Sequence, residues 1–276
     1  MSTVPAVEPV REAAPDAPRR RRVPWGGIAL AIALPLILVL VWQVATWVFS
    51  PREWILPSPA AVARAGWDAA DRLWYHAQWT ILITVLGFAL AAVVGSLLAT
   101  LIARSRIAGL MLYPWIIVSQ TIPLVALAPL LVLWMPEFGA MVTLAALISI
   151  FPVVVAGVDG LRGTDPEVLR AVRALGASDG WAWWHVRVPA AMPRMFTGLR
   201  LAAVFAVTGA VVGELVASER GLGALTRLSA GQFETPLTFA AVVILALIGI
   251  AMFALVALAQ WLCLPYLRRG TRPGSR

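Results

Sequence analysis

Six long runs of apolar residues dominate this chain and decide what it folds into. They occupy residues 25–49, 79–103, 108–135, 140–158, 197–217 and 237–266. At 1.5 Å per residue, each run is long enough to cross a bilayer's hydrocarbon core of about 30 Å. Because 61% of the 276 residues are hydrophobic and only 13% are charged, water is not the main solvent for this chain. The sequence predicts an all-α integral membrane protein of about six transmembrane helices.

Two of these runs have features that bear on the topology. The first, 25–49, is longer than the apolar part of a signal peptide, and no small-residue cleavage site follows it, so we interpret it as an uncleaved span. The third contains Pro114, Pro123 and Pro129, which predict kinks because proline removes a helical hydrogen bond. Whether this span is one helix or a broken one stays open.

The placement of arginine predicts the orientation of the spans. All 22 basic residues are arginine. If the N-terminus is inside, 17 of them lie on the inner side, and the outer side keeps Arg52, Arg64, Arg72, Arg220 and Arg227. This split follows the positive-inside rule and puts both termini in the cytoplasm.

The same patterns divide the chain into three parts. Residues 1–24 are expected to be a disordered basic tail, 25–266 the transmembrane domain, and 267–276 a second cytoplasmic tail. The basic tail is expected to enforce the orientation, with binding to anionic membrane lipid as the alternative. Nucleic-acid binding is not indicated, although the isoelectric point is 11.2.

The residue types that are rare or absent exclude several functions. Without lysine, the chain has no phosphate-binding loop of the G-x-x-x-x-G-K-[ST] type and no lysine Schiff base. Cys263 has no second cysteine for an internal disulfide and is interpreted as helix packing. His76 and His185 lie far apart without acids or cysteines at ligand spacing, so neither a metal nor a cofactor is expected.

A polar segment of about 35 residues, 159–194, separates the fourth and fifth apolar runs and is expected in the cytoplasm. Its first half predicts a short helix capped by Thr164 or Asp165 and ended by Gly176. Apolar residues fall at i, i+3, i+4 and i+7 on one face of that helix, namely Val168, Ala171, Val172 and Leu175.

The second half of the segment predicts another helix. It is expected to begin at a Ser178-Asp179 cap, to carry Trp181, Trp184 and His185, and to end at Val188-Pro189. Two short helices at a steep angle would form a rigid knob in the cytoplasm.

This knob resembles the cytoplasmic signature of bacterial ABC importer permeases, which reads Glu-Ala-Ala, three residues, Gly, nine residues, Ile, one residue and Leu-Pro. The matching positions keep every spacing and are Arg170-Ala171-Val172, Gly176, Val186 and Val188-Pro189. Arg170 departs from the family glutamate, which puts only that residue's contact in doubt. The resemblance implies that the knob docks on an ATPase subunit through Glu167, Arg170, Ala171, Val172, Gly176, Val186 and Pro189.

The resemblance covers most of residues 50–266 and is strongest with permeases for sulfonate, taurine and nitrate, or for thiamine-precursor pyrimidines and riboflavin. The supporting stretches are Leu56-Pro57-Ser58-Pro59, Gln120-Thr121-Ile122-Pro123, Ala128-Pro129-Leu130, Gly213-Glu214 and Gly221-Leu222-Gly223. It implies a catalytically silent permease in the bacterial inner membrane. It also implies two ATPase copies, an extracytoplasmic substrate-binding protein and a second permease copy as partners.

Four polar residues are candidates for the translocation path. Ser119, Gln120 and Thr121 form a polar step beside Pro123 and would either face the path or bond neighbouring helices. Glu214 would either line the path or be an interfacial carboxylate, in water or paired with Arg220.

An ion-coupled secondary transporter or channel is the alternative function. Such a protein is expected to bury ionisable residues near the bilayer midplane and to show inverted repeats. Apart from Glu214, the sequence shows neither feature.

Overall fold

The computed structural model describes residues 25–265, so the two predicted tails, 1–24 and 267–276, lie outside the described residues. The chain divides into two compact units, one ending at Ser50 and one beginning at Pro51. The described part of the first unit is helix α1 (Trp25–Phe49), an apolar helix whose side chains from Leu34 onward are mostly exposed. Within residues 25–265 all regular secondary structure is helical, which confirms the all-α class.

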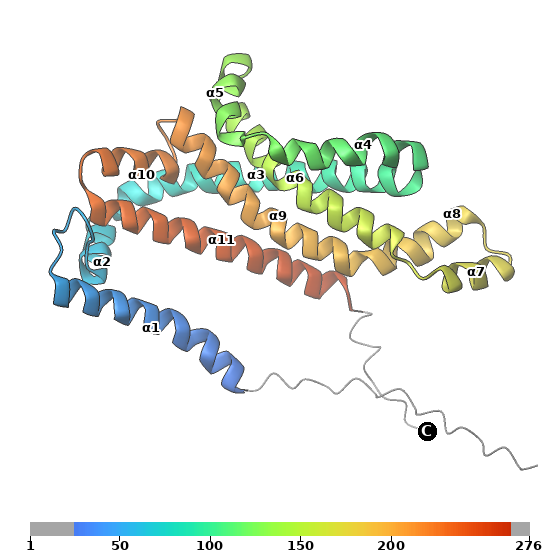
Figure 1. The fold of residues 1–276 in the computed structure, drawn as a ribbon, viewed down its shortest axis with the longest axis horizontal. Helices are drawn as coiled ribbons and strands as arrows, with labels where there is room; N and C mark the ends of the chain where they lie inside the picture. The colour runs from blue at the N-terminus through green and yellow to red at the C-terminus, as the bar shows by residue number, and fades with distance from the viewer. Residues whose placement is uncertain (1–24, 266–276) are drawn as a thin grey trace, which may run out of the picture. The chain divides into compact units, whose positions relative to one another are not determined.

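The second unit is a bundle of helices joined by short segments (Figure 1). In chain order it contains α2 (Pro59–Asp68), α3 (Ala70–Arg104), α4 (Arg106–Val118), a 3-10 turn (Ser119–Thr121), α5 (Leu124–Trp134), α6 (Glu137–Arg162), α7 (Pro166–Ala174), α8 (Asp179–Ala182), a π-turn (Trp183–Arg187), α9 (Val188–Ala217), α10 (Leu222–Gly231) and α11 (Thr235–Cys263).

Four single helices among the described residues are long and apolar enough to cross a membrane: α3, α6, the continuous helix Asp179–Ala217, and α11. The pair Arg106–Thr121 and Val125–Trp134 is a fifth if it is counted as one span. In α1, the described apolar stretch, Ala33–Phe49, is shorter. The number six therefore stays a prediction.

The third apolar run is not one straight helix. The chain bends by 107° between Arg106–Thr121 and Val125–Trp134. Pro123 causes the break, because the residue before a proline is pushed out of the helical region, and Ile122 is indeed extended, with φ −77° and ψ 124°. Pro114 and Pro129 lie inside α4 and α5 and end neither helix.

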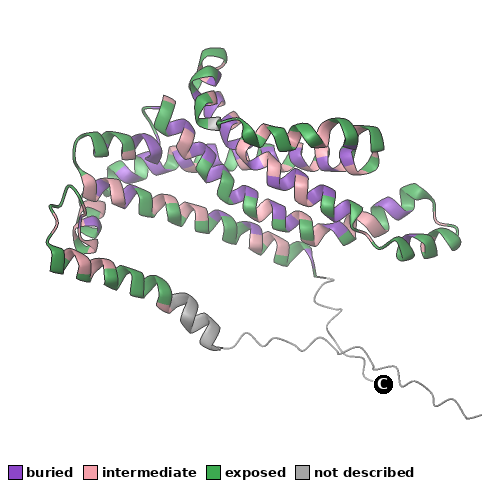
Figure 2. Cartoon of the chain, viewed as in Figure 1, coloured by how far each residue is buried: buried purple, intermediate pink, exposed green. Residues whose placement is uncertain are grey.

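The core of the bundle is the contact of α6 with α3 and α9. Of its most apolar stretch, α6 has 56% buried, whereas α11 has 17% (Figure 2). Small residues let these backbones approach. A Cβ added to Gly209 of α9 would lie 2.6 Å from Ala145 Cα of α6, and one added to Gly198 would lie 2.6 Å from Ala156 Cβ. Such close packing is how helices associate where apolar burial gives no advantage over lipid.

The two ends of the bundle differ in character. At one end lie α7 and α8, and at the opposite end lie α2 and α10 (Figure 1). We call these the α7 end and the α10 end. The candidate residues from the sequence fall at both ends and at the break between α4 and α5.

Candidate functional site

At the α7 end, helix α7 begins and ends as its sequence predicts. The Asp165 carboxylate accepts the Glu167 amide at 2.8 Å and caps the first turn. Gly176 has φ +88°, a left-handed conformation that favours glycine. Its amide donates to Arg173 O, and the Ala177 amide donates to Val172 O, which together close the helix by a Schellman motif.

The predicted apolar face of α7 points away from the bundle. Leu175 is 87% exposed and Val168 is 45% exposed, while Leu169, off that face, is buried and anchors the helix. A cavity of about 480 Å³ adjoins this face and is lined by Val172, Leu175, Gly176, Ala177, Ser178 and Trp181. We call Val168, Ala171, Val172 and Leu175 the α7 face; it is the apolar surface on which another protein could dock.

The charged residues of α7 have different partners. Arg170 and Glu167 form an exposed pair with an N–O distance of 3.7 Å, which contributes little to stability. Arg173 donates to Asp179 from both Nε and Nη2, at 2.9 and 2.8 Å. The second pair joins α7 to α8 across the turn, so the two helices are held together.

The second predicted helix of the knob does not end where the sequence suggested. Ser178 caps it by accepting the Trp181 amide, as predicted. At Val188-Pro189, however, the helix continues into α9 without a break. Pro189 lies in the first turn of α9, where the missing amide is tolerated once the residues before it form a π-turn. Val186 lies in that π-turn, and both residues are half-buried.

Ser119, Gln120 and Thr121 form the 3-10 turn at the break between α4 and α5. The Ser119 hydroxyl donates to Ile116 O and the Thr121 hydroxyl donates to Val118 O, each at 2.7 Å. These bonds satisfy carbonyls that the helix end leaves free. Gln120 and Thr121 are exposed on the second unit, so the turn presents polar atoms on an otherwise apolar span.

At the α10 end, Glu214 is fully buried in the last turn of α9. Its Oε2 accepts the Thr80 hydroxyl of α3 at 3.0 Å and the Gly223 amide at 2.9 Å. The Thr80 oxygen in turn accepts the Leu222 amide at 2.8 Å. The arrangement ties α9 and α3 to the first residues of α10. Arg220, the ion-pair partner that the sequence offered, instead lies over the Trp79 ring at 5.5 Å.

The segment from Ser218 to Gly223 is held by further polar contacts. The Ser218 hydroxyl donates a hydrogen bond to the Glu137 carboxylate at the start of α6. The Ser218 carbonyl accepts a hydrogen bond from the Arg227 guanidinium of α10. His76 Nδ1 lies 3.0 Å from Gly221 O, which assigns the donated proton to Nδ1 because a carbonyl only accepts. Four helices thus fasten this segment.

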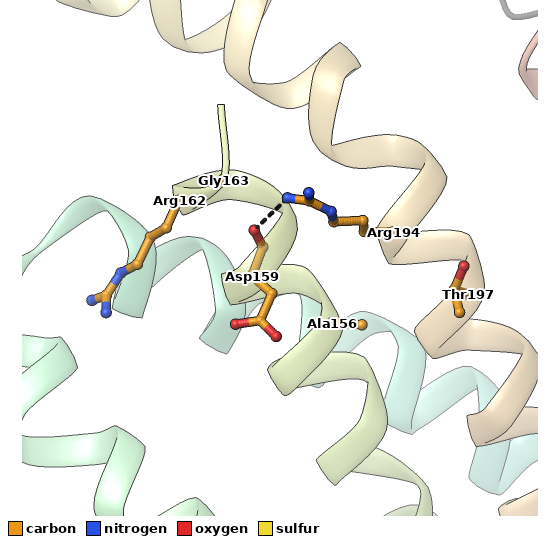
Figure 3. A pocket seen from close by; sticks show the side chains of 6 residues that line it. All are labelled: Ala156, Asp159, Arg162, Gly163, Arg194 and Thr197. Atoms are coloured by element: carbon orange, nitrogen blue, oxygen red, sulfur yellow. Dashed lines mark hydrogen bonds between the residues drawn. The ribbon is translucent and has the colours of Figure 1, made fainter. Parts of the chain in front are cut away.

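Between α6 and α9 at the α7 end lies a cavity of about 640 Å³ with two arginines in its wall (Figure 3). Arg194 donates to Asp159 O at 3.1 Å and Arg162 donates to Ile102 O at 2.7 Å. Both guanidiniums therefore bond carbonyls in the last turns of α6 and α3, where positive charge stabilises a helix. The Asp159 carboxylate points away from Arg194 (Figure 3).

Most of the chain matches a known protein family. Residues 91–262, which include the break, the α7 face and Glu214, match the family described as the binding-protein-dependent transport system inner membrane component. The chain belongs to this family of ABC transporter permeases.

Several relatives are similar to this permease over most of its length. The formylaminopyrimidine transport permease protein ThiX of Halalkalibacterium halodurans is 33% identical over 85% of this chain and 94% of its own. The riboflavin transport system permease protein RibX of Chloroflexus aurantiacus is 37% identical over 91% of this chain and 95% of its own. A putative aliphatic sulfonates transport permease protein, SsuC of Bacillus subtilis, is 31% identical over 86% of each chain.

A solved structure shows the same fold. The crystal structure titled as an amino acid ABC transporter with histidines has a TM-score of 0.57, covers 73% of this permease and 95% of its own chain, and is 21% identical. The helical arrangement of the second unit is therefore one that ABC transporters use.

Sequence reasoning missed two groups of residues in this permease. Thr80 and His76 gave no signal, because their partners lie more than 130 residues away in the chain. The sequence predicts no role for Trp183, although it is the buried member of the group Trp181, Trp183 and Trp184. Gly221 and Gly223 enter the sequence analysis only through the family resemblance. Their short distance from Glu214 in the chain was the signal that could have linked them to it.

Proposed function

We propose that this permease forms the translocation path of an ATP-binding-cassette importer and is moved by separate ATPase subunits that dock on the α7 face. Two permease copies would enclose the path, and an extracytoplasmic binding protein would deliver the substrate at the α10 end. The observation that carries the proposal is the outward apolar surface of α7 on a helix that is rigidly capped at both ends.

The exposed apolar surface of α7 favours burial against a partner. A side chain such as Leu175, 87% exposed in water, contributes about 1.5–3 kcal/mol when a partner buries it. The Asp165 cap and the Schellman motif fix both ends of α7 before docking, so little ordering entropy opposes binding. Family members have a glutamate at the position of Arg170, and that glutamate would make a charged contact with the ATPase. In this chain the same contact would be made by a positive group.

The orientation follows from charge. The α7 end carries Arg162, Arg170, Arg173, Arg187 and Arg194, and positive residues favour the cytoplasmic side. The α7 end is thus proposed to face the cytoplasm of a bacterium, within reach of ATP, with both termini on the same side and the α10 end outside.

The substrate class comes from the relatives, which are named for formylaminopyrimidine, riboflavin and aliphatic sulfonates. We propose a small organic or anionic solute of this kind. Ser119, Gln120 and Thr121 would offer it hydrogen bonds where the path narrows at the break. Glu214 would shape the outer end of the path by holding residues 218–223 in place.

A point substitution tests the docking surface more cleanly than deletion of residues 165–189, which would also remove the buried Leu169 and Trp183. We expect Leu175→Glu to weaken binding of a candidate ATPase subunit encoded beside this permease by at least about tenfold, since tenfold corresponds to 1.4 kcal/mol. The matched control is Gln232→Glu, an exposed position at the α10 end. Equal co-purification of the ATPase with both variants would reject the α7 face as its docking site.

A further inference from the structure

Three tryptophans follow one another closely at the start of the Asp179–Ala217 helix, and only one of them is buried. Trp181 is 48% exposed, Trp184 is 62% exposed and Trp183 is 6% exposed. Trp183 packs in a cluster with Leu161, the penultimate residue of α6, and Ala103, the penultimate residue of α3. One cluster therefore joins the ends of two core helices to a third helix, and Trp183 is its largest member.

The π-turn explains how Trp183 reaches this position. The other α9 members of its cluster include Ala191 and Met195. In an uninterrupted α-helix, these residues would be rotated from Trp183 by about 80° and 120°, at 100° per residue. The π-turn bonds the Val188 amide to Trp183 O, a step of five residues instead of four. The extra residue reduces both rotations to about 20° and brings Trp183 onto the buried stripe of α9.

Two arginines, one at the end of α3 and one in the π-turn, lie against the Trp183 ring. The guanidinium carbon of Arg104, the last residue of α3, lies 5.7 Å from the ring centroid, and that of Arg187 lies 5.8 Å from it. Both distances are within cation–π range. The Trp183 indole Nε1 is buried without a hydrogen-bond partner, so packing and the two cations, not a hydrogen bond, hold the ring.

These contacts define a route for motion. The Arg173–Asp179 pair joins α7 to α8, and α8 continues through the π-turn into α9. Packed interiors do not compress, so a displacement of α7 and α8 acts on α3 and α6 through the side chains packed between them. Trp183 is the largest side chain of that cluster.

We propose that Trp183 is the positioning residue that carries displacement of α7 and α8 into the inner ends of α3 and α6, with the π-turn setting its register. The proposal rests on the proposed function, because it needs an ATPase to move α7. It adds that the packing of α6 against α9 and the short chain connection from α6 to α7 are not sufficient to carry the motion. Without the Trp183 ring, α9 still receives it, and the inner ends of α3 and α6 do not respond.

The test is hydrogen exchange measured by mass spectrometry on the permease–ATPase complex in nanodiscs, with and without MgATP and orthovanadate. In the unchanged protein, trapping should alter amide exchange in residues 165–182 and also in 97–104 and 157–162. In Trp183→Ala, the change in 165–182 should persist and the change in the other two segments should be lost. Trp183→Phe should keep most of the response, and Trp184→Ala, the matched exposed control, should keep all of it.

A second variant keeps the test decisive if Trp183→Ala does not fold. Trp183→Leu keeps an apolar side chain at this position, but the leucine is too short to reach across the cluster from α9 to α3 and α6. This variant should also lose the response at the ends of α3 and α6. A full response there in either variant overturns the role of Trp183 and leaves the docking proposal intact. Absence of any nucleotide-dependent change in residues 165–182 of the unchanged complex overturns the docking proposal itself.

Discussion

Replacing Gly221 by alanine is expected to loosen the α10 end of this permease. Gly221 has φ +98° and ψ 162°, a region that is essentially restricted to glycine, and holding another residue there costs about 1–3 kcal/mol. An added Cβ would also collide with the Glu214 carboxyl group. The carboxylate would have to leave its place between Thr80 and Gly223.

The two effects set the expected magnitude. Each buried donor left without its acceptor costs about 1–3 kcal/mol, and relaxation would recover part of what is lost. We therefore expect Gly221→Ala to cost about 3–5 kcal/mol in all. For a chain of this size, 1 kcal/mol shifts Tm by about 2–4 °C, so the loss corresponds to about 6–20 °C.

Two other glycines separate the contributions. Gly176 has φ +88° and nothing within 4 Å of an added Cβ, so Gly176→Ala reports backbone strain alone, about 1–2 kcal/mol. Gly231, the last residue of α10, also has nothing within 4 Å, and Gly231→Ala should be neutral or slightly stabilising. The assay is the temperature at which half of the detergent-solubilised protein loses its monodisperse peak in size-exclusion chromatography.

The result that refutes the reasoning is a Gly221→Ala midpoint equal to that of Gly231→Ala. A double-mutant cycle sharpens the test. If the collision with the carboxyl group is real, Gly221→Ala should cost less in a Glu214→Ala background, with a coupling of at least about 1 kcal/mol.

Three further predictions concern Glu214, the α6–α9 contact and Arg170. Glu214→Ala should lower thermal stability by about 2–4 kcal/mol, because it leaves buried donors unsatisfied, and Glu214→Gln should lower it by less because it keeps an acceptor. Gly209→Val should cost at least about 1–3 kcal/mol by overpacking the α6–α9 contact, whereas Gly249→Val, with open space around it, should cost less in the same assay. Arg170→Glu should change stability by less than about 1 kcal/mol yet reduce ATPase co-purification; an unchanged yield would remove Arg170 from the docking contact.

Local features of the knob were predictable because their causes are local. Asp165 and Ser178 cap helices through amides two or three residues away, and Gly176 ends α7 through its own φ. The continuation past Val188-Pro189 was not predictable in this way. It depends on the π-turn, which forms where Trp183 is drawn into a cluster with α3 and α6.

The third span shows the same limit. Its prolines indicated kinks, but proline chemistry alone treats Pro114, Pro123 and Pro129 alike. Only the structure shows that Pro123 is the one that breaks the helix, after a polar turn whose hydroxyls bond the freed carbonyls. The other two are absorbed within α4 and α5.

The membrane environment and the all-α class could be predicted from the length of the apolar runs, because that pattern can be interpreted without knowing any tertiary contact. The start and the end of α7 were also predictable from local residues. The tertiary structure alone decided that Glu214 is a buried anchor for residues 218–223, that the α7 face is exposed, and that Trp183 joins three helices. The physical reason is that each of these depends on groups far apart in the chain, whose meeting is set by packing and not by local pattern.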